Sequence, residues 1–335
     1  MPAEWEPQEA VWLAWSDIAE LWPGNFPGVE ESYIRLVGTL SQSEVVRLLV
    51  RDEPSKQHAI ELLSSRGARM ENIQFFILPY DDCWMRDNGP IYLIDASGKK
   101  LIVDWGFNGW GDKFGPYDQD DVVPQHIAKH FGIECLQPGI ILEGGSIENN
   151  GQGLLMTSEQ CLLNPNRNGN KTRADLEPFL IDYFCGDKVI WLKDGLCNDH
   201  TDGHIDNLAR FVAPDHVVAV LAEDKAHPDY DSTHENIEII KSSKDVKGNP
   251  LRVTTIPLPP PIEDSGESMS PSHANFILAN HLVIVPTYGF ETDEESVNIL
   301  AKIFPDRRVI GQPSLDILLG GGSFHCISQQ EPRIG

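Results

Sequence analysis

The 335-residue sequence has few basic residues for its size. It contains 26 lysines and arginines against 51 aspartates and glutamates, which gives a net charge of −25. Nucleic-acid binding depends on clustered lysine and arginine, so this charge argues against a nucleic-acid partner. A negative field raises the local concentration of cations instead. The composition is therefore compatible with a cationic substrate, although solubility alone also accounts for an acidic surface.

Long apolar runs and paired cysteines are also missing. No apolar run approaches about 18 residues, the length that a membrane span requires, so we expect no membrane partner. The opening MPAEWEPQEAVWLAW has neither a basic region nor a long apolar core, and we expect no signal peptide. The six cysteines are scattered, without a C-x-x-C pair. This pattern favours reduced thiols in a cytoplasmic protein over a disulfide framework.

Helical and extended patterns alternate along the whole chain. Apolar residues share one helical face in GVEESYIRLVGTL (28–40), and residues 175–184 and 293–304 show the same period. Short β-branched runs lie between such segments, which predicts an α/β fold. Segments 222–250 and 257–273 are poor in core residues, and we expect surface excursions there, with a loop over the site as one option. No linker between independent domains is evident.

A polar or glycine-containing cluster repeatedly opens a pair of short strands. The first polar positions of four such segments are Asp87, Glu143, His204 and Asn275, which are 56, 61 and 71 residues apart, and Cys326 follows 51 residues later. Such spacing suggests repeated supersecondary units around a common axis, each bringing its polar cluster to the centre. The ordinary strand–loop alternation of α/β proteins is the simpler alternative.

The polar positions also suggest a chemistry. Three consecutive glycines lead to Cys326, and a reactive cysteine needs close access and a group that favours its thiolate. The other candidates are Asp87, Glu143, His204 and Asp206. Carboxylates in excess raise the pKa of a thiol unless a cation lies between them. A guanidinium is planar, always charged and pairs well with carboxylates, so the cluster predicts a guanidinium site beneath a sulfur atom.

Six segments, in this order, resemble those of agmatine deiminases. They are PAEWEPQEAVWLAW, WMRDNGP, LEGGSI, LLNPNRN, DGHIDN and GGGSFHCISQQEP. Agmatine deiminases belong to the guanidine-modifying (pentein) superfamily, which includes arginine deiminases, amidinotransferases and bacterial peptidylarginine deiminases. The similarity runs essentially end to end. It implies a five-bladed α/β propeller built from pseudo-repeated ββαβ units, a single catalytic domain over residues 1–335, and no metal or other cofactor.

The resemblance also implies roles for the candidate residues. Cys326 would attack the guanidinium carbon to form a covalent thiouronium. His204 would protonate the departing ammonia and then activate the water that hydrolyses this intermediate. Glu143 would orient His204 and contact the guanidinium. Asp87 and Asp206 would hold the guanidinium nitrogens.

Other positions near these segments carry weaker expectations. Trp84 matches a family position that packs against the substrate, although a tryptophan is as often a core residue. Ser323 and Phe324 stand where the family more often has an Asn–Ile pair, and Asp202 stands where Asn is usual; these departures bear on the exact substrate more than on the reaction. His325 neighbours the thiol, but adjacent residues on a strand point to opposite faces, so it is not expected to be the base.

The function that the resemblance implies is hydrolysis of agmatine to N-carbamoylputrescine and ammonia, in polyamine synthesis or agmatine breakdown. Deimination of arginine or of a peptide's C-terminal arginine is the alternative. A zinc hydrolase is less favoured; its ligands would be Cys197, His200, His204 and Asp206. A non-catalytic polyamine-binding protein would need the carboxylates but not the thiol. The expected partner is a small cationic guanidine, and a homodimer is compatible with the sequence, which does not fix the oligomeric state.

Overall fold

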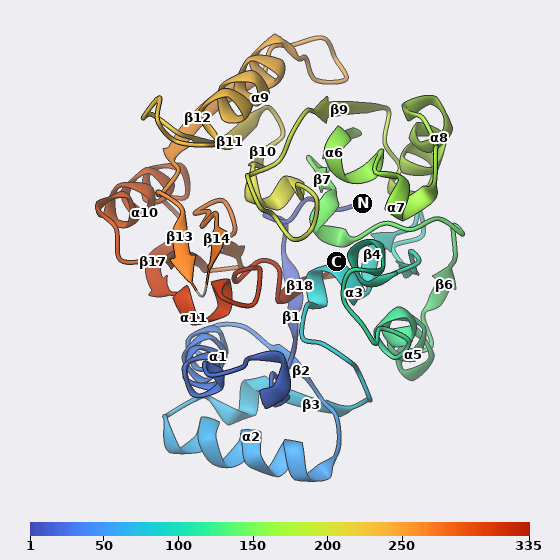
Figure 1. Cartoon of the computed structure of the whole chain (residues 1–335). Helices are drawn as coiled ribbons and strands as arrows, with labels where there is room; N and C mark the ends of the chain where they lie inside the picture. Colours follow the sequence, from blue (N-terminus) through green and yellow to red (C-terminus); the bar gives the residue numbers. More distant parts are fainter. Residues whose placement is uncertain (265) are drawn as a thin grey trace.

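The computed structural model describes residues 1–264 and 266–335, and its sheets lie around the middle of the molecule (Figure 1). One sheet joins the beginning and the end of the chain in the order β18-β1-β2-β3. Strand β18 pairs antiparallel with β1, whereas β1, β2 and β3 are parallel. The bounds are β1 (Gln8–Ala14), β2 (Val46–Val50), β3 (Ile73–Ile77) and β18 (Ser328–Pro332), with helices α1 (Phe26–Ser41) and α2 (Glu53–Ser65).

Four further sheets among the described residues repeat one pattern. In each, two strands form an antiparallel pair, and the second strand pairs in parallel with a third. The strands are β4 (Ile91–Ile94), β5 (Lys100–Val103) and β6 (Glu134–Leu136); β7 (Glu148–Asn149), β8 (Leu154–Ser158) and β9 (Lys188–Leu192); β10 (Ala209–Ala213), β11 (His216–Leu221) and β12 (Arg252–Pro257); β15 (Ile277–Leu278), β16 (Leu282–Thr287) and β17 (Arg308–Pro313).

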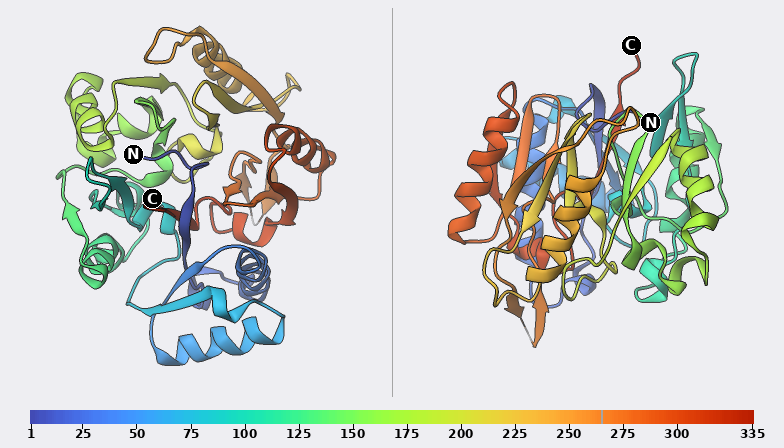
Figure 2. Two further views of the ribbon diagram at one scale, coloured as in Figure 1. Left: turned by 180° about the vertical axis from the view of Figure 1, so that it is seen from behind. Right: turned by 90° about the horizontal axis from the view of Figure 1, so that it is seen from above.

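Helices occupy the parallel connections of these four sheets. The main ones are α5 (Val123–Phe131), α8 (Arg173–Phe184), α9 (Tyr230–Ser242) and α10 (Glu291–Ile303). Figures 1 and 2 show them toward the outside of the molecule, with the sheets between them and its middle. None of the helices in the described part of the chain combines the length and apolar character that crossing a bilayer requires. The predicted α/β alternation is confirmed.

One of the two expected surface excursions is an ordered part of the fold. Segment 222–250 contains α9, whose buried face consists of Thr233, Asn236, Ile237 and Ile240. The prediction for this segment was wrong because half of that buried face is polar. Segment 257–273 forms a small hairpin of β13 (Ile262–Asp264) and β14 (Glu267–Met269), and its residue 265 lies outside the described residues.

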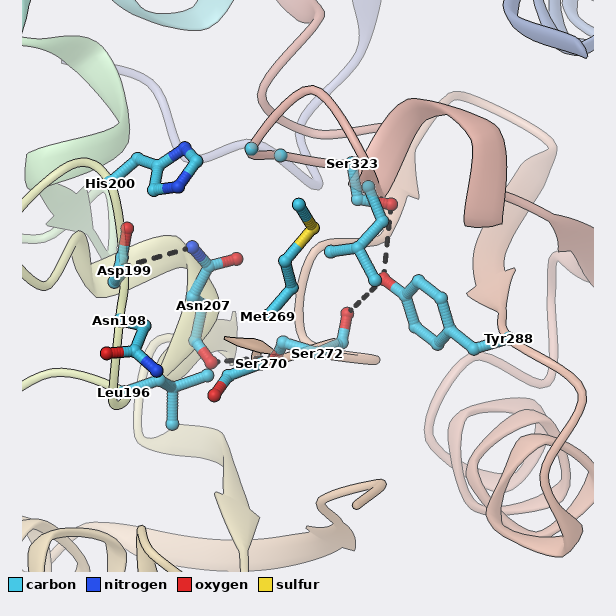
Figure 3. A pocket seen from close by; sticks show the side chains of 13 residues that line it. Leu196, Asn198, Asp199, His200, Asn207, Met269, Ser270, Ser272, Tyr288 and Ser323 are labelled. Atoms are coloured by element: carbon cyan, nitrogen blue, oxygen red, sulfur yellow. Dashed lines mark hydrogen bonds between the residues drawn. The ribbon is translucent and has the colours of Figure 1, made fainter. Parts of the chain in front are cut away.

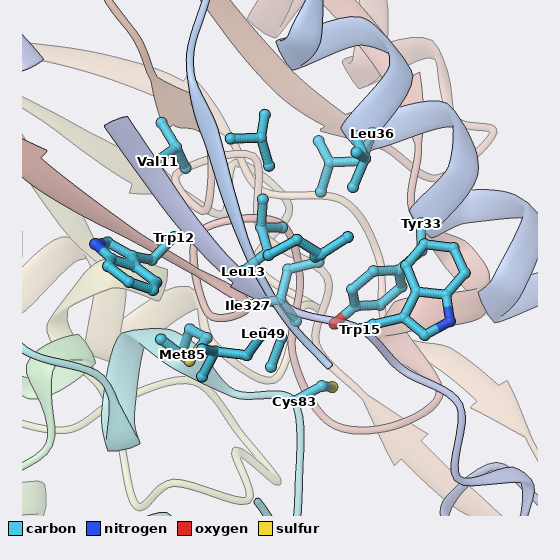
Figure 4. Packing of buried hydrophobic residues seen from close by; sticks show 14 of the residues in the cluster. Val11, Trp12, Leu13, Trp15, Tyr33, Leu36, Leu49, Cys83, Met85 and Ile327 are labelled. Atoms are coloured by element: carbon cyan, nitrogen blue, oxygen red, sulfur yellow. The ribbon is translucent and has the colours of Figure 1, made fainter. Parts of the chain in front are cut away.

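The largest described core packs around β1. Its residues from Val11 to Trp15 are buried, and Trp15 meets Tyr33 of α1 edge-on at 6.0 Å between ring centroids. Ile327, which follows Cys326, belongs to the same cluster (Figure 4). The segment that carries the predicted nucleophile is therefore anchored in this core.

Glu331 of β18 connects the closing sheet to its neighbours. Its carboxylate is 2% exposed, accepts from Nε1 of Trp12 at 2.8 Å and from Nζ of Lys100 at 2.5 Å, and pairs with Arg47. Both of these cations also contact Glu9, which is 41% exposed. Two nearly buried cations thus depend on one buried carboxylate.

We expect Glu331→Gln to lower the free energy of unfolding by about 3 kcal/mol, because it leaves two buried cations short of a counter-charge. Urea unfolding measures the change. The matched control is Glu9→Gln, which removes the exposed partner of the same cations and should cost less than about 1 kcal/mol. Equal losses in the two variants would contradict this account of Glu331.

Candidate active site

The polar clusters that open the sheets meet in one buried space. Asp87 lies on the short helix α3 (Met85–Asn88) before β4, and Glu143 directly precedes the turn η4 (Gly144–Ser146) before β7. His204 and Asp206 lie at the turn η5 (Ile205–Asn207) before β10, and Cys326 lies before β18. Each is at most 7% exposed. The repeated strand pairs thus deliver each side chain from the same structural position.

Distances show how closely these groups approach. The Sγ atom of Cys326 lies 3.7 Å from Oδ2 of Asp206. Nδ1 of His204 lies 3.7 Å from Oδ1 of Asp87, and Nε2 lies 3.8 Å from Oε2 of Glu143. The structure brings all five predicted residues together, and their chemical roles stay predictions.

A glycine at the middle of the cluster makes this crowding possible. A Cβ atom on Gly145 would lie 2.5 Å from Nδ1 of His204, 2.8 Å from Oδ1 of Asp87 and 3.2 Å from Oδ2 of Asp206. The Gly145 N–H also donates to Oδ1 of Asp87 at 3.0 Å. Any side chain here would push the three groups apart.

Several buried polar atoms of the cluster lack a hydrogen-bond partner within the described chain. They are both ring nitrogens of His204, Oε2 of Glu143 and Oδ1 of Asp206. Buried polar atoms in folded proteins are nearly always paired, so exceptions need an explanation. A ligand that carries several N–H donors would satisfy the two carboxylate oxygens.

The carboxylates make the free thiol hard to ionise. Burial, followed by the charges of Asp206 and Asp87, raises the pKa of Cys326 well above its usual value. Burial also raises the pKa of Asp87 to about 6, and the carboxylates of Asp206 and Glu143 add to the effect. Asp87 is therefore the carboxyl group of this cluster that is protonated most easily.

His204 and Glu143 hold their charges through each other. Burial alone would lower the pKa of His204, but the charge of Asp87, together with the nearby Cys161 and Glu143, outweighs burial and raises that pKa. Burial likewise opposes ionisation of Glu143, yet its contacts with His204 and Arg167 lower the pKa of the carboxyl group. The histidine is thus poised as a proton donor.

Arg167 was given no role by the sequence analysis, although it lies in LLNPNRN. It sits on the short helix α7 (Pro165–Asn168), is fully buried as a side chain, and donates from Nε to Oε1 of Glu143 at 2.7 Å. Its two other nitrogens bind the carboxylate of Asp202 at 2.5 Å and the carbonyl of Thr201 at 2.8 Å. Arg167 thereby fixes one oxygen of Glu143 and leaves the other free.

Asn275 is one of the regularly spaced polar positions, but the sequence predicted no role for it. Its Nδ2 donates to Sγ of Cys326 at 3.0 Å. Its Oδ1 accepts from the backbone nitrogens of His325 at 2.9 Å and Cys326 at 3.2 Å. One side chain therefore positions the cysteine backbone and offers a hydrogen bond to the sulfur, which favours a thiolate.

A cavity of about 380 Å³ gives access to the sulfur. Its lining consists of Asp82, Trp84, Asp87, Trp110, Phe114, His200, Thr201, Gly320, Gly321 and Cys326. The rings of Trp84 and Trp110 meet edge-on, with centroids 6.5 Å apart, and Nε1 of Trp110 donates to Oδ2 of Asp87 at 2.9 Å. Trp84 therefore lines the cavity, as a substrate contact must, while Trp110 was missed because its segment matches no quoted motif.

The glycine run before the cysteine serves this cavity. A Cβ atom on Gly322 would clash with the Trp84 ring, and one on Gly321 would lie 2.6 Å from Nδ1 of His200. Gly321 also has a φ of 105°, which side chains disfavour. The run lets the backbone pass close to the aromatic wall.

A second cavity, of about 420 Å³, lies next to the first and shares His200 and Gly321 with it (Figure 3). The hydroxyl of Tyr288 donates to the carbonyl of Ser272 at 3.1 Å and lies 3.2 Å from Oγ of Ser323. Ser323 therefore faces this second cavity, whereas Phe324 is buried in the core. Of these two departures from the family pattern, Ser323 is the one that shapes a pocket.

The alternative zinc ligands are not assembled. Within the described chain, the acid, cysteine and histidine groups with ligand-like spacing are Glu143–Cys161–His204 and Glu4–Glu148–His325. Cys197 is exposed, and His200 forms part of the cavity wall. The four residues that spacing alone suggested as zinc ligands therefore do not form one cluster in the structure.

Comparison with known proteins identifies the family. The model of the Porphyromonas-type peptidyl-arginine deiminases matches residues 1–332. The chain belongs to this family. A Legionella pneumophila protein whose provisional name is agmatine deiminase is 36% identical, over 99% of this chain and 94% of the relative. The resemblance seen in the six segments is confirmed.

Solved structures of relatives share the fold. The agmatine deiminase of Enterococcus faecalis matches with a TM-score of 0.94 and 32% identity, covering 100% of this chain and 96% of the other. A cysteine-to-serine agmatine deiminase of C. jejuni with substrate bound matches with a TM-score of 0.89 and 30% identity, covering 99% and 96%. The α/β architecture is therefore that of this enzyme family.

We expect Gly145→Ala to reduce turnover by about a hundredfold or more, because the added methyl group displaces His204 and two carboxylates from each other. Ammonia release and circular dichroism measure activity and folding together. Gly38→Ala is the control: Gly38 lies in α1, and an added Cβ atom there would have nothing within 4 Å, so this variant should keep full activity. Normal turnover by Gly145→Ala would show that the cluster is not the reaction centre.

Proposed function

We propose that this enzyme hydrolyses agmatine to N-carbamoylputrescine and ammonia. The observation that carries the proposal is the buried cluster of three carboxylates around one accessible thiol, in which two carboxylate oxygens lack partners. A guanidinium supplies planar N–H donors and a permanent positive charge for such a cluster. The similarity to agmatine deiminases of two other organisms supports this substrate.

The cluster divides the binding of the guanidinium among its acids. Asp87 and Asp206 would accept from its terminal nitrogens, and the free oxygen of Glu143 would accept from a third N–H group. Trp84 and Trp110 would form an aromatic wall beside the substrate and exclude water, which strengthens each charged hydrogen bond.

Substrate binding itself favours the thiolate. In the free enzyme, burial and the acids near Cys326 raise the pKa of the thiol and hold its proton on the sulfur. A bound guanidinium places a positive charge among those acids, so the thiol proton is released to solvent. The amide of Asn275 then donates to the anionic sulfur. The thiolate of Cys326 is thus formed only when a guanidinium substrate is bound.

The chemical steps follow from the protonation of His204. The thiolate adds to the guanidinium carbon, and the charged ring of His204 protonates one nitrogen, which leaves as ammonia. The covalent product is a thiouronium. Neutral His204 takes a proton from water, whose oxygen bonds to the same carbon; the carbon–sulfur bond breaks, and the hydroxyl proton returns to the sulfur. Ammonia takes up the proton that was released at the start.

The lining of the cavity favours agmatine over arginine. Its described lining residues include no lysine or arginine, whereas Asp82 contributes a further carboxyl group. The carboxylate of arginine, or of a peptide's C-terminal arginine, would meet this acid without a cation to pair with. Agmatine has no carboxylate and avoids the conflict.

We infer that the sheets form the blades of a five-bladed α/β propeller and that residues 1–335 are one catalytic domain. The repeated strand order and the sheet shared by both chain ends support this inference. We also propose a cytoplasmic site of action, in agreement with six cysteines that are all free thiols.

The first test compares ammonia release from agmatine, arginine and a peptide with C-terminal arginine. We expect agmatine to be the preferred substrate by at least about tenfold in kcat/KM, because one unpaired carboxylate costs more than about 1.4 kcal/mol. Cys326→Ser is the blank, and acid-quenched wild-type enzyme should carry an adduct with the mass of agmatine less ammonia. Tight agmatine binding without turnover would favour the polyamine-binding alternative.

The second test is the pH profile of kcat/KM. We expect it to fall as the pH drops through about 6, because Asp87 has a pKa of about 6 and pairs with a guanidinium only as a carboxylate. Asp82 also has a pKa of about 6. Asp82→Asn should keep the acid limb, while Asp87→Asn should lose the limb and roughly 10–100-fold of activity. If the fall of kcat/KM at low pH persists in Asp87→Asn, a group other than Asp87 causes it.

A further inference from the structure

His325, next to Cys326 in the sequence, contacts the site without lining the cavity. Its ring is 1% exposed and is not among the cavity-lining residues. Nδ1 lies 2.8 Å from Oδ2 of Asp206, and Nε2 lies 3.1 Å from Oε2 of Glu4. Glu4 comes from the beginning of the chain, 321 residues away. The histidine therefore bridges a predicted substrate-binding acid and a distant, buried carboxylate.

The two contacts place a carboxyl oxygen at each ring nitrogen of His325. A neutral imidazole offers one donor and one acceptor, whereas an ionised carboxylate only accepts. Burial opposes ionisation of both acids, but Arg210 and His325 lower the pKa of Glu4, and hydrogen bonding to His325 lowers that of Asp206. Each ring nitrogen of His325 thus lies within hydrogen-bond distance of a carboxyl oxygen, and a ring that donates to both oxygens is an imidazolium.

Behind Glu4 the charges continue to alternate. Arg210 is 1% exposed and donates to Glu4 at 2.6 Å and to Glu148 at 2.5 Å. Its remaining nitrogen donates to the carbonyls of Ala274 and Phe276, each at 3.0 Å. Every nitrogen of the guanidinium is thus used inside the protein. Glu4 is therefore held at a defined place between Arg210 and the ring of His325.

The consequence appears in the two acids that face the substrate. Asp206 has the ring of His325 against Oδ2, and its Oδ1 is left without a partner in the described chain. Asp87 has the ring of His204 at 3.7 Å but no hydrogen bond to a cation, and burial raises its pKa to about 6 although His204 opposes the rise. Two carboxylates in one buried space repel each other's charge, so a cation behind one of them decides which stays ionised.

We propose that His325 is a positioning residue, held as an imidazolium by Glu4, that keeps Asp206 ionised and turns its free oxygen toward the guanidinium. Glu4 thereby supports catalysis although it never touches the substrate. The inference rests on the proposed role of Asp206 in binding a guanidinium. The charged groups that face His325 are Asp206, Glu4, Glu148, Arg86 and Arg210.

The protonation state is tested without any assay of activity. Histidine-selective ¹⁵N labelling distinguishes an imidazolium from a neutral ring, and loss of one signal in His325→Asn assigns the resonance. In the wild-type enzyme, at the pH of the activity assay, we expect both nitrogens of His325 to carry protons because each faces a carboxyl oxygen. In Glu4→Gln the ring should become neutral at that pH. A neutral His325 in the wild type, or a ring unchanged by Glu4→Gln, overturns the proposal whether or not agmatine is the substrate.

Kinetics separate positioning from simple loss of stability. We expect Glu4→Gln to raise KM for agmatine about tenfold and to move the acid limb of kcat/KM up by about one pH unit, with kcat at high pH nearly retained, because ionisation of Asp206 then competes with that of Asp87. The control is Glu44→Gln, a 3% exposed acid bonded to Asn280 and not to His325. It should leave KM and the limb unchanged. A loss of kcat with an unchanged profile in Glu4→Gln would mean a structural role only.

If agmatine is not turned over by the wild-type enzyme, the proposed function fails while the NMR result still decides the state of His325. If agmatine is turned over and the ring is neutral, the proposed function stands and this inference fails. If Glu4→Gln does not fold, the wild-type spectrum alone carries the decision.

Discussion

Buried carboxylates lie close around Cys326, and the partner that compensates the charge of each one determines the properties of the site. Glu143 is paired with Arg167, and Asp206 is paired with His325. Asp87 receives only the indole N–H of Trp110, the N–H of Gly145 and a distant contact to His204 among the described residues. An unpaired buried charge is costly, so the free site favours protonated groups and a binding cation reverses that preference. The enzyme is thereby poised for a positively charged ligand.

The molecule already contains a guanidinium in a similar setting. Arg210 lies between the carboxylates of Glu4 and Glu148, with its Cζ 4.7 Å from the ring centroid of Phe276. The candidate substrate site offers the same combination of buried acids and aromatic rings for a cation that comes from outside. His325 stands between the two places and touches an acid of each. The fold thus uses one recognition chemistry twice, once for its own side chain and once for a ligand.

The site could be predicted from the sequence because its main residues lie at the starts of strand pairs, within a few positions of a glycine, as Asp87, Glu143 and His204 do. It did not reach Arg167, Trp110 or Glu4, since their contacts join segments that no local pattern relates. It also misjudged segment 222–250, where polar residues such as Asn236 are buried because α9 packs on β11. Spacing along the chain therefore predicts which loops converge, whereas the partners that set their charges become visible only in three dimensions.

The pairing of β18 with β1 also determines when the site around Cys326 can assemble during synthesis. A ribosome makes β1 before Cys326, and Glu4, Asp206 and Asn275 are all synthesised before the cysteine that they surround. Contacts between positions so far apart are slow to form because the chain loses much freedom when its ends meet. Until Cys326 is made, the carboxylates that surround it in the folded protein remain exposed to water in the nascent chain. Pairing of β18 with β1 therefore completes this sheet and positions Cys326 in one event.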